Sequence, residues 1–457
     1  MAEPNGVPEY KDLRIPEEQI ARLRDLIANS RFAEVGQMLC DMEPEDLAEI
    51  LSEFSLDEKL IIFNSLELED AAVVLDDTDP QSRLQLLQKL ESEKLAQILD
   101  EMPVDEAADV IEDVPEKERE DLLELMQDDD AEEVEEILSY PEDSAARVMN
   151  PNFISVKGDI SVEEAVSDIR EKEIDEDIFY VYVIDSENKL KGVIPLRQLI
   201  TARKGTLIKD IMDPDTHYIY VDEDQEKAAH IMKKYDVYSL PVIDHREELV
   251  GRITADDIID VMDEERGEDI SRMTGTIEEE QGTETTLMAT QNRLPWLITC
   301  MLGSIITGLV IQMFEVTLTE TIALVSFIPV ITATGGNSGV QASTVVVREI
   351  ALGTMDFGKI GEEVWRQLKI ALSLGVVCGA VLTVLANFWK QNAVVGTIVG
   401  LSIFLVVIWS NVVGVVIPTM FKRLKIDPAI ASGPLITTLN DVIGVFIYLT
   451  VAATFLK

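Results

Sequence analysis

Five long apolar runs fill the last third of the chain and predict helices that cross a membrane. The runs lie at 294–314, 321–347, 365–388, 394–421 and 431–456. Each is long enough for the ~20 residues that a helix needs to cross a bilayer. We therefore expect a five-helix transmembrane domain over 293–457, with the lipid bilayer as a partner.

A shorter pattern repeats through the first third of the chain. Apolar residues recur at i, i+3 and i+4, the spacing of one helix face, in EDLAEIL (45–51), EDAAVVL (69–75), EKLAQIL (93–99) and DEAADVI (105–111). The first three segments lie 24 residues apart. This periodicity is typical of stacked helical hairpins and predicts an acidic helical-repeat domain over 1–148.

A different repeat covers 149–255. VMNP recurs as IMDP, and YVIDSENKLKGVI recurs as LPVIDHREELVGRI. Short β-branched runs separated by turn residues indicate two α/β units, each with helices and strands. An acidic connecting helix and a linker are expected over 256–292, so the chain as a whole is mainly α.

Charge is distributed very unevenly along the chain. The formal net charge is -48, yet residues 293–457 hold 10 Lys/Arg and 8 Asp/Glu, so nearly all of the excess acid precedes them. Such a surface repels nucleic acid and attracts cations, so no nucleic-acid partner is expected. The three cysteines are isolated, which favours free thiols over a disulfide or zinc framework.

Basic residues in the loops predict the orientation in the membrane. They gather before the first run, between the second and third, and between the fourth and fifth. Because positive loops stay in the cytoplasm, we expect a multi-pass protein of the cell membrane. Its N-terminal domains lie in the cytoplasm and its C-terminus lies outside.

One carboxylate, Asp441, stands inside the fifth run, and no run offers an interior Lys or Arg. An ionised side chain at mid-bilayer costs on the order of 3 kcal/mol or more. A water-filled cation path explains it better than the alternative, a hydrogen-bonded neutral acid. Thr437 lies one helical turn earlier and faces the same way. Oxygen ligands of this kind suit magnesium or calcium, and a homodimer would place two copies of Asp441 across an axis.

The segment TATGGNSGVQAS (332–343) breaks the second run with small and polar residues. Gly335 and Gly336 are expected to weaken the helix, so that freed carbonyls and the Asn337 amide line an aqueous cavity. Close helix packing through small residues is the alternative.

The paired repeat resembles a tandem of CBS domains, a module that often binds adenosine nucleotides. The second unit ends in GRITADDI, and the resemblance implies that Thr254 and Asp257 hold a ribose. The first unit has Pro195 where a hydroxyl is expected, so at most one site for ATP follows. A structural or metal-sensing role for the pair is the alternative.

The domain order, together with GGNSGVQAS and PLITTLNDVIG, resembles the MgtE-type magnesium channel family along nearly the whole chain. The resemblance implies a homodimeric, magnesium-selective channel for magnesium uptake, closed by cytosolic magnesium. It places the pore aspartate on Asp441 and the glycine–asparagine motif on Gly335, Gly336 and Asn337. The implied acidic sensor positions are Asp257, Asp260, Glu265, Glu268 and Asp269 on the connecting helix, Asp224, Glu226 and Asp236 in the second CBS unit, and Asp105, Glu106 and Asp109 in the helical domain.

Two other functional classes fit the residues. One is a secondary transporter for magnesium, manganese or cobalt, coupled to protons or sodium, in which Asp441 relays protons. The other is a sensor that transports nothing and signals through its CBS pair. An enzyme is not expected, because no nucleophile–base pair or catalytic metal cluster stands out in the sequence.

Overall fold

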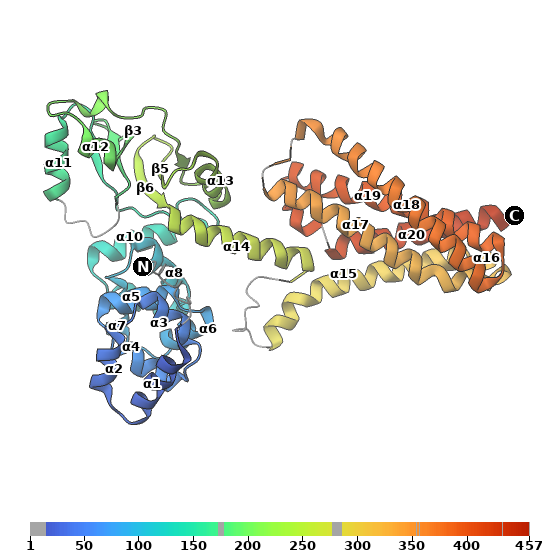
Figure 1. Ribbon diagram of the computed structural model, residues 1–457, viewed down its shortest axis with the longest axis horizontal. Coiled ribbons are helices and arrows are strands. Elements are labelled where there is room, and N and C mark those ends of the chain that lie inside the picture. The colour runs from blue at the N-terminus through green and yellow to red at the C-terminus, as the bar shows by residue number, and fades with distance from the viewer. Residues whose placement is uncertain are drawn as a thin grey trace, which may run out of the picture. The chain divides into compact units, whose positions relative to one another are not determined.

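The computed structural model describes residues 15–171, 178–276, 286–352, 354–355, 357–431 and 433–456. The chain divides into two compact units, Met1–Asp263 and Glu264–Lys457, and Figure 1 labels most of their elements. The first unit holds the helical repeats and the paired α/β repeat. The second unit holds the apolar helices.

The predicted helical repeats are confirmed as a layer of short helices. Their apolar faces are buried, for example Leu51, Leu75, Leu99 and Ile111. Ends are set locally, since Pro44 and Pro80 begin helices and Ser55 forms a capping box. The helices are α1 (Glu17–Ala28), α2 (Phe32–Leu39), α3 (Pro44–Leu51), α4 (Leu56–Phe63), α5 (Leu68–Asp77), α6 (Pro80–Leu87), α7 (Ser92–Leu99), α8 (Val104–Glu112), α9 (Glu116–Leu123) and α10 (Asp128–Leu138).

The paired repeat forms two small sheets of the same topology, β1-β2-β3 and β4-β5-β6. In each sheet the first two strands run parallel and the last two antiparallel. A hydrogen bond of 2.7 Å between the Tyr182 hydroxyl and Ser239 Oγ joins β2 to β5. The elements are β1 (Ser155–Lys157), α11 (Val162–Glu171), β2 (Tyr180–Ile184), β3 (Leu190–Pro195), α12 (Leu196–Thr201), β4 (Ile219–Tyr220), α13 (Gln225–Tyr235), β5 (Ser239–Ile243) and β6 (Leu249–Thr254).

The acidic connecting segment is a helix, as the sequence predicts. Helix α14 (Ala255–Thr274) is continuous, and its first turns belong to the first unit while its last turns belong to the second. Of the predicted linker, 277–285 lies outside the described residues, and 286–292 already belongs to the next helix.

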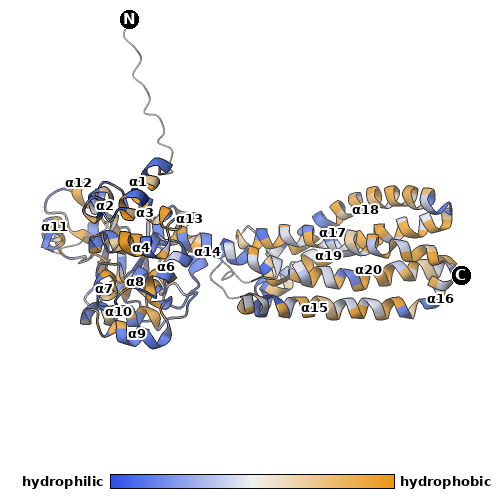
Figure 2. Ribbon diagram, turned by 90° about the horizontal axis from the view of Figure 1, so that it is seen from below, coloured by the Kyte–Doolittle hydropathy of each residue, from blue (hydrophilic) through white to orange (hydrophobic). Residues whose placement is uncertain are grey.

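Among the described residues of the second unit, five helices are long and apolar enough to cross a membrane, which confirms the predicted spans. Figure 2, in which the ribbon is coloured by hydropathy, shows that hydrophobic residues run along these helices. The most buried is α19, while α15 and α18 expose most of their surface. The five helices are α15 (Thr286–Met313), α17 (Ile328–Ala351), α18 (Ile360–Lys390), α19 (Ala393–Arg423) and α20 (Gly433–Leu456), with the short α16 (Glu315–Glu320) between the first two.

The expected break at the glycines is wrong, because α17 is an unbroken helix through 335–339. Tertiary packing outweighs the low helix propensity of glycine here. A Cβ added at Gly335 would lie 2.7 Å from Val406 of α19, and one added at Gly339 would overlap Asn440 of α20. The alternative expectation, close packing through small residues, describes this segment.

Candidate functional site

The intramembrane carboxylate lies where α20 faces the glycines of α17. A Cβ added at Gly336 would lie 3.2 Å from Thr437 Cγ2 and 3.9 Å from Asp441 Oδ1. Asp441 and Thr437 are one turn apart and partly buried, and the Thr437 hydroxyl donates back to the Gly433 carbonyl at 3.0 Å. In the part of the chain that the structure describes, Asp441 has no hydrogen-bond or ion-pair partner.

The structure thus brings together three of the five predicted pore residues. The other two face elsewhere, because successive residues of a helix differ in direction. Gly335 packs on Val406 and Ser410 of α19. The Asn337 side chain is exposed on the surface of the protomer.

Polar side chains that the sequence did not predict as site residues are buried behind the glycines. Asn440 is completely buried, and neither its oxygen nor its nitrogen has a partner among the described residues. Asn411 Nδ2 donates to Ser338 Oγ at 2.6 Å, which links α19 to α17. Asparagine beside aspartate was visible in the sequence, but its direction depends on the packing of three helices.

A second group of carboxylates gathers in the first unit, and we call it the carboxylate cluster. It consists of Asp76 and Asp77 of α5, Glu106 of α8, and Asp257 and Asp260 of α14. Burial, and then the charges of its neighbours, raise the pKa of Glu106 to about 9. Burial raises the pKa of Asp76 to about 6, against the opposing charge of Arg83. Burial also raises the pKa of Asp257 and of Asp260.

These shifts mean that the cluster resists carrying its full negative charge, because like charges and poor solvation both favour the neutral acid. A divalent cation would relieve this repulsion. Asp76 and Asp77 were not predicted as site residues, since nothing in the sequence sets the end of α5 apart from other acidic helix ends.

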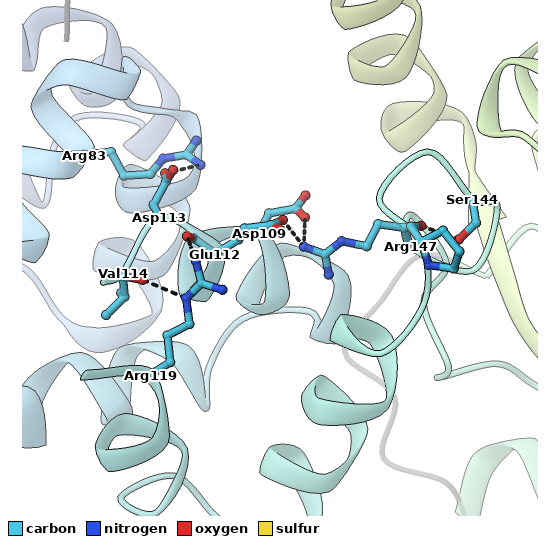
Figure 3. Close-up of polar contacts among 9 residues, drawn as sticks. Arg83, Asp109, Glu112, Asp113, Val114, Arg119, Ser144 and Arg147 are labelled. Atoms are coloured by element: carbon cyan, nitrogen blue, oxygen red, sulfur yellow. Dashed lines mark hydrogen bonds and ion pairs between the residues drawn. The ribbon is translucent and has the colours of Figure 1, made fainter. Parts of the chain in front are cut away.

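The remaining predicted residues of α8 point to other partners. Asp105 Oδ1 accepts a hydrogen bond from Asn150 Nδ2 at 3.3 Å. Asp109 Oδ1 lies 3.4 Å from the guanidinium of Arg147 (Figure 3). Asp105 and Asp109 thus have protein partners outside the carboxylate cluster, although the charge of Asp105 also raises the pKa of Glu106.

The other predicted sensor residues lie at separate places. Asp224 caps α13 by accepting from the Glu226 backbone N–H at 2.9 Å, and Asp236 ends the same helix in the left-handed region. On the last turns of α14, Glu268 forms an ion pair with Arg272, which also pairs with Asp427. Burial and the charge of Asp427 raise the pKa of Asp269, against Lys422. Glu265 lies three residues before Glu268 on the same helix.

The predicted ribose-binding pair lies at the corner between β6 and α14. Asp257 Oδ2 accepts from the Thr254 backbone N–H at 2.7 Å and from its hydroxyl at 2.6 Å. The two residues are thus adjacent, and here they are bonded to each other. Within the described residues, no three His, Cys, Asp or Glu side chains form a preassembled metal site.

Comparison with known proteins covers both units. A model described as a divalent cation transporter matches 328–451, one for the MgtE intracellular N domain matches 42–143, and one for the CBS domain matches 145–205 and 208–264. The magnesium transporter MgtE of Enterococcus faecalis is 36% identical over 324 residues, 71% of each chain. That of Thermus thermophilus is 36% identical over 330 residues, 71% of this chain and 72% of the relative.

Two solved structures resemble about half of the chain. The soluble part of a magnesium transporter matches with a TM-score of 0.50 at 30% identity, covering 55% of this chain and 98% of that one. The cytosolic domain of the Mg2+ channel MgtE in complex with ATP matches with a TM-score of 0.50 at 32% identity, covering 52% and 98%. Together with five helices that can cross a membrane, these relatives show that the chain belongs to the MgtE family of magnesium transporters.

Proposed function

We propose that this protein is a magnesium-selective channel of the cell membrane that cytosolic magnesium closes. The observation that carries the proposal is Asp441, a carboxylate without a protein partner in the described chain, set beside Thr437 and the bare backbone of Gly336. An unpaired carboxylate inside a membrane is expensive unless it meets water or a cation.

The ion is held through water in this proposal. Magnesium gives up its water reluctantly, so we propose that Asp441 contacts the water shell of the ion and not the bare ion. One carboxylate balances half of the ion's charge. We therefore propose a twofold homodimer in which two copies of Asp441 face one conduit.

Substitution of Asp441 tests the pore. Asp441→Ala should abolish magnesium flux into proteoliposomes, whereas Glu362→Ala, an exposed carboxylate at the start of α18, should leave flux unchanged. Undiminished flux in Asp441→Ala would refute the pore assignment. Steady single-channel current in a planar bilayer supports a channel, and flux that requires a proton or sodium gradient supports a coupled transporter instead.

Closure by magnesium is proposed to act through the carboxylate cluster. Without metal, holding Asp76, Glu106, Asp257 and Asp260 close together costs free energy, through charge repulsion or through proton uptake, and this cost opposes the compact form of the first unit. Hydrated magnesium relieves that repulsion, and α14 carries the change toward the membrane helices. Magnesium shifts the population only if it binds the compact form more tightly.

Neutralising Asp257 and Asp260 together tests this regulation. The double alanine variant should keep conducting at internal magnesium that closes the wild type. The exposed Glu118→Ala change on α9 serves as the control and should close normally. Normal closure in the double variant would refute the sensor assignment.

We also propose that the N-terminal domains lie in the cytoplasm and the C-terminus outside, as the basic loops indicate.

ATP is proposed to bind the CBS pair beside Thr254 and Asp257, because a related cytosolic domain is described in complex with ATP. A ribose would exchange the Thr254–Asp257 hydrogen bond for its own. Thr254→Val should weaken ATP binding to the full-length protein in calorimetry, and unchanged affinity would place the nucleotide elsewhere.

A further inference from the structure

The segment 144–150, which we call the strap, joins the helical domain to the CBS pair. Its backbone is bonded to the second CBS unit at both ends. The N–H groups of Ala145 and Ala146 donate to the carbonyls of Glu223 and Val221, at 2.6 and 3.2 Å. Asn150 exchanges two backbone hydrogen bonds with Arg252 of β6, at 2.8 and 2.9 Å. The strap therefore moves with the CBS pair.

The side chains of the strap reach one face of α8. Asp105, Asp109 and Glu112 stand at i, i+4 and i+7, so they line a single stripe of that helix. Asn150 bonds Asp105, while Arg147 forms ion pairs with Asp109 and Glu112 (Figure 3).

Arg147 is an unusual member of this contact because its side chain is only 4% exposed, whereas Asp109 and Glu112 are 54% and 43% exposed. A buried guanidinium that spans two carboxylates is strongly held, and removing its partners leaves an uncompensated buried charge. The two acids lie near the C-terminal end of α8, where a cation is also favoured by the helix dipole.

We propose that Arg147 is a built-in counterion that docks α8 on the CBS pair without metal. It is a positioning residue: it occupies the anionic face of Asp109 that a magnesium ion would otherwise bridge. The helical domain is then held by two different devices on adjacent faces of α8. The strap acts at any magnesium concentration, and the carboxylate cluster around Glu106 responds to magnesium. The magnesium response of the carboxylate cluster rests on the proposed function.

The test is hydrogen exchange in α8 and the strap of the full-length protein, in EDTA and across a magnesium titration. Arg147→Gln should lower protection in EDTA about tenfold, the effect of losing a charged hydrogen bond. Protection should return at high magnesium, because the freed Asp109 and Glu112 can share an ion. Arg119→Gln is the matched control, since Arg119 donates to carbonyls of Glu112 and Val114 within the helical domain and does not reach the strap.

The double variant Asp109→Asn, Glu112→Gln separates a counterion from a metal site. If Arg147 is the docking cation, the double variant loses the same protection in EDTA, magnesium does not restore it, and the triple variant with Arg147→Gln is no worse. If Asp109 is instead a magnesium ligand, the double variant keeps wild-type protection in EDTA and loses only its magnesium response. That second result would overturn the inference.

A folding defect can be told apart from loss of the docking contact. Should Arg147→Gln or the double variant fail to fold by circular dichroism, the single variants Asp109→Asn and Glu112→Gln still decide, because each alters an exposed side chain and leaves Arg147 one carboxylate partner. The EDTA measurements also separate this inference from the proposed function. If Arg147→Gln leaves protection in EDTA unchanged while magnesium still closes the wild type, the counterion role alone is refuted. If Arg147→Gln lowers protection in EDTA tenfold but magnesium does not close the wild type, the proposed regulation alone is refuted.

Discussion

Replacing Glu106 by glutamine is expected to stabilise the first unit at neutral pH when no divalent metal is present. Burial, reinforced by the charges of Asp76, Asp105 and Asp257, raises the pKa of Glu106 from 4.5 to about 9. At pH 7 the folded chain therefore holds a proton that the unfolded chain has released. Glutamine has nearly the same shape as the protonated acid and needs no proton.

The magnitude follows from this difference in proton binding. A carboxyl whose pKa is raised by folding costs nothing below pH 4.5, and its cost grows as the pH rises toward 9. At pH 7 the cost is about 3 kcal/mol, from 1.36 kcal/mol for each pH unit above the ordinary pKa. This value is an upper limit, because neighbouring carboxyls can take up the proton instead. Glu106→Gln should recover most of it.

The assay is urea unfolding of the full-length protein in EDTA, followed by hydrogen exchange in α8. The control is Glu118→Gln on α9, whose side chain is exposed and should change the free energy of unfolding by less than about 0.5 kcal/mol. The gain from Glu106→Gln should disappear at pH 4 and shrink when magnesium is added to the wild type. A variant no more stable than the control at pH 7, or equally stabilised at pH 4, would refute the reasoning.

Three further predictions concern the wild type and its packing. In EDTA the first unit should lose stability as the pH rises from 5 to 8, because the unfolded chain releases protons that the folded chain retains on carboxyls with a raised pKa. Hydrogen exchange in α8 should show this loss of stability with pH, and added magnesium should reduce it. Tyr182→Phe should cost about 1 kcal/mol in urea unfolding, because it breaks the buried bond to Ser239 that joins the two sheets. Gly339→Ala should cost about 1–3 kcal/mol and lower flux by displacing Asn440, whereas Gly308→Ala, which faces open space, should do neither; equal flux in both variants would contradict the packing argument.

Local pattern determined the elements of this protein. Five apolar runs became five long helices, the 24-residue repeat became stacked short helices, and alternating β-branched runs became two matching sheets. Each follows from the period of side chains along a helix or a strand, which depends on neighbours in sequence alone. The order of the domains and the presence of a carboxylate in the fifth span could also be predicted from the sequence.

Only the tertiary structure decided which of these residues act together. Asp105 and Glu106 are adjacent in sequence, yet one bonds the strap and the other enters the carboxylate cluster with Asp76. Sequence could not separate them, because that choice depends on which elements pack against each side of α8. The glycines of α17 likewise weaken an isolated helix but favour a packed one, since the missing side chains let α19 and α20 approach. Long-range packing sets these directions, and no local pattern encodes it.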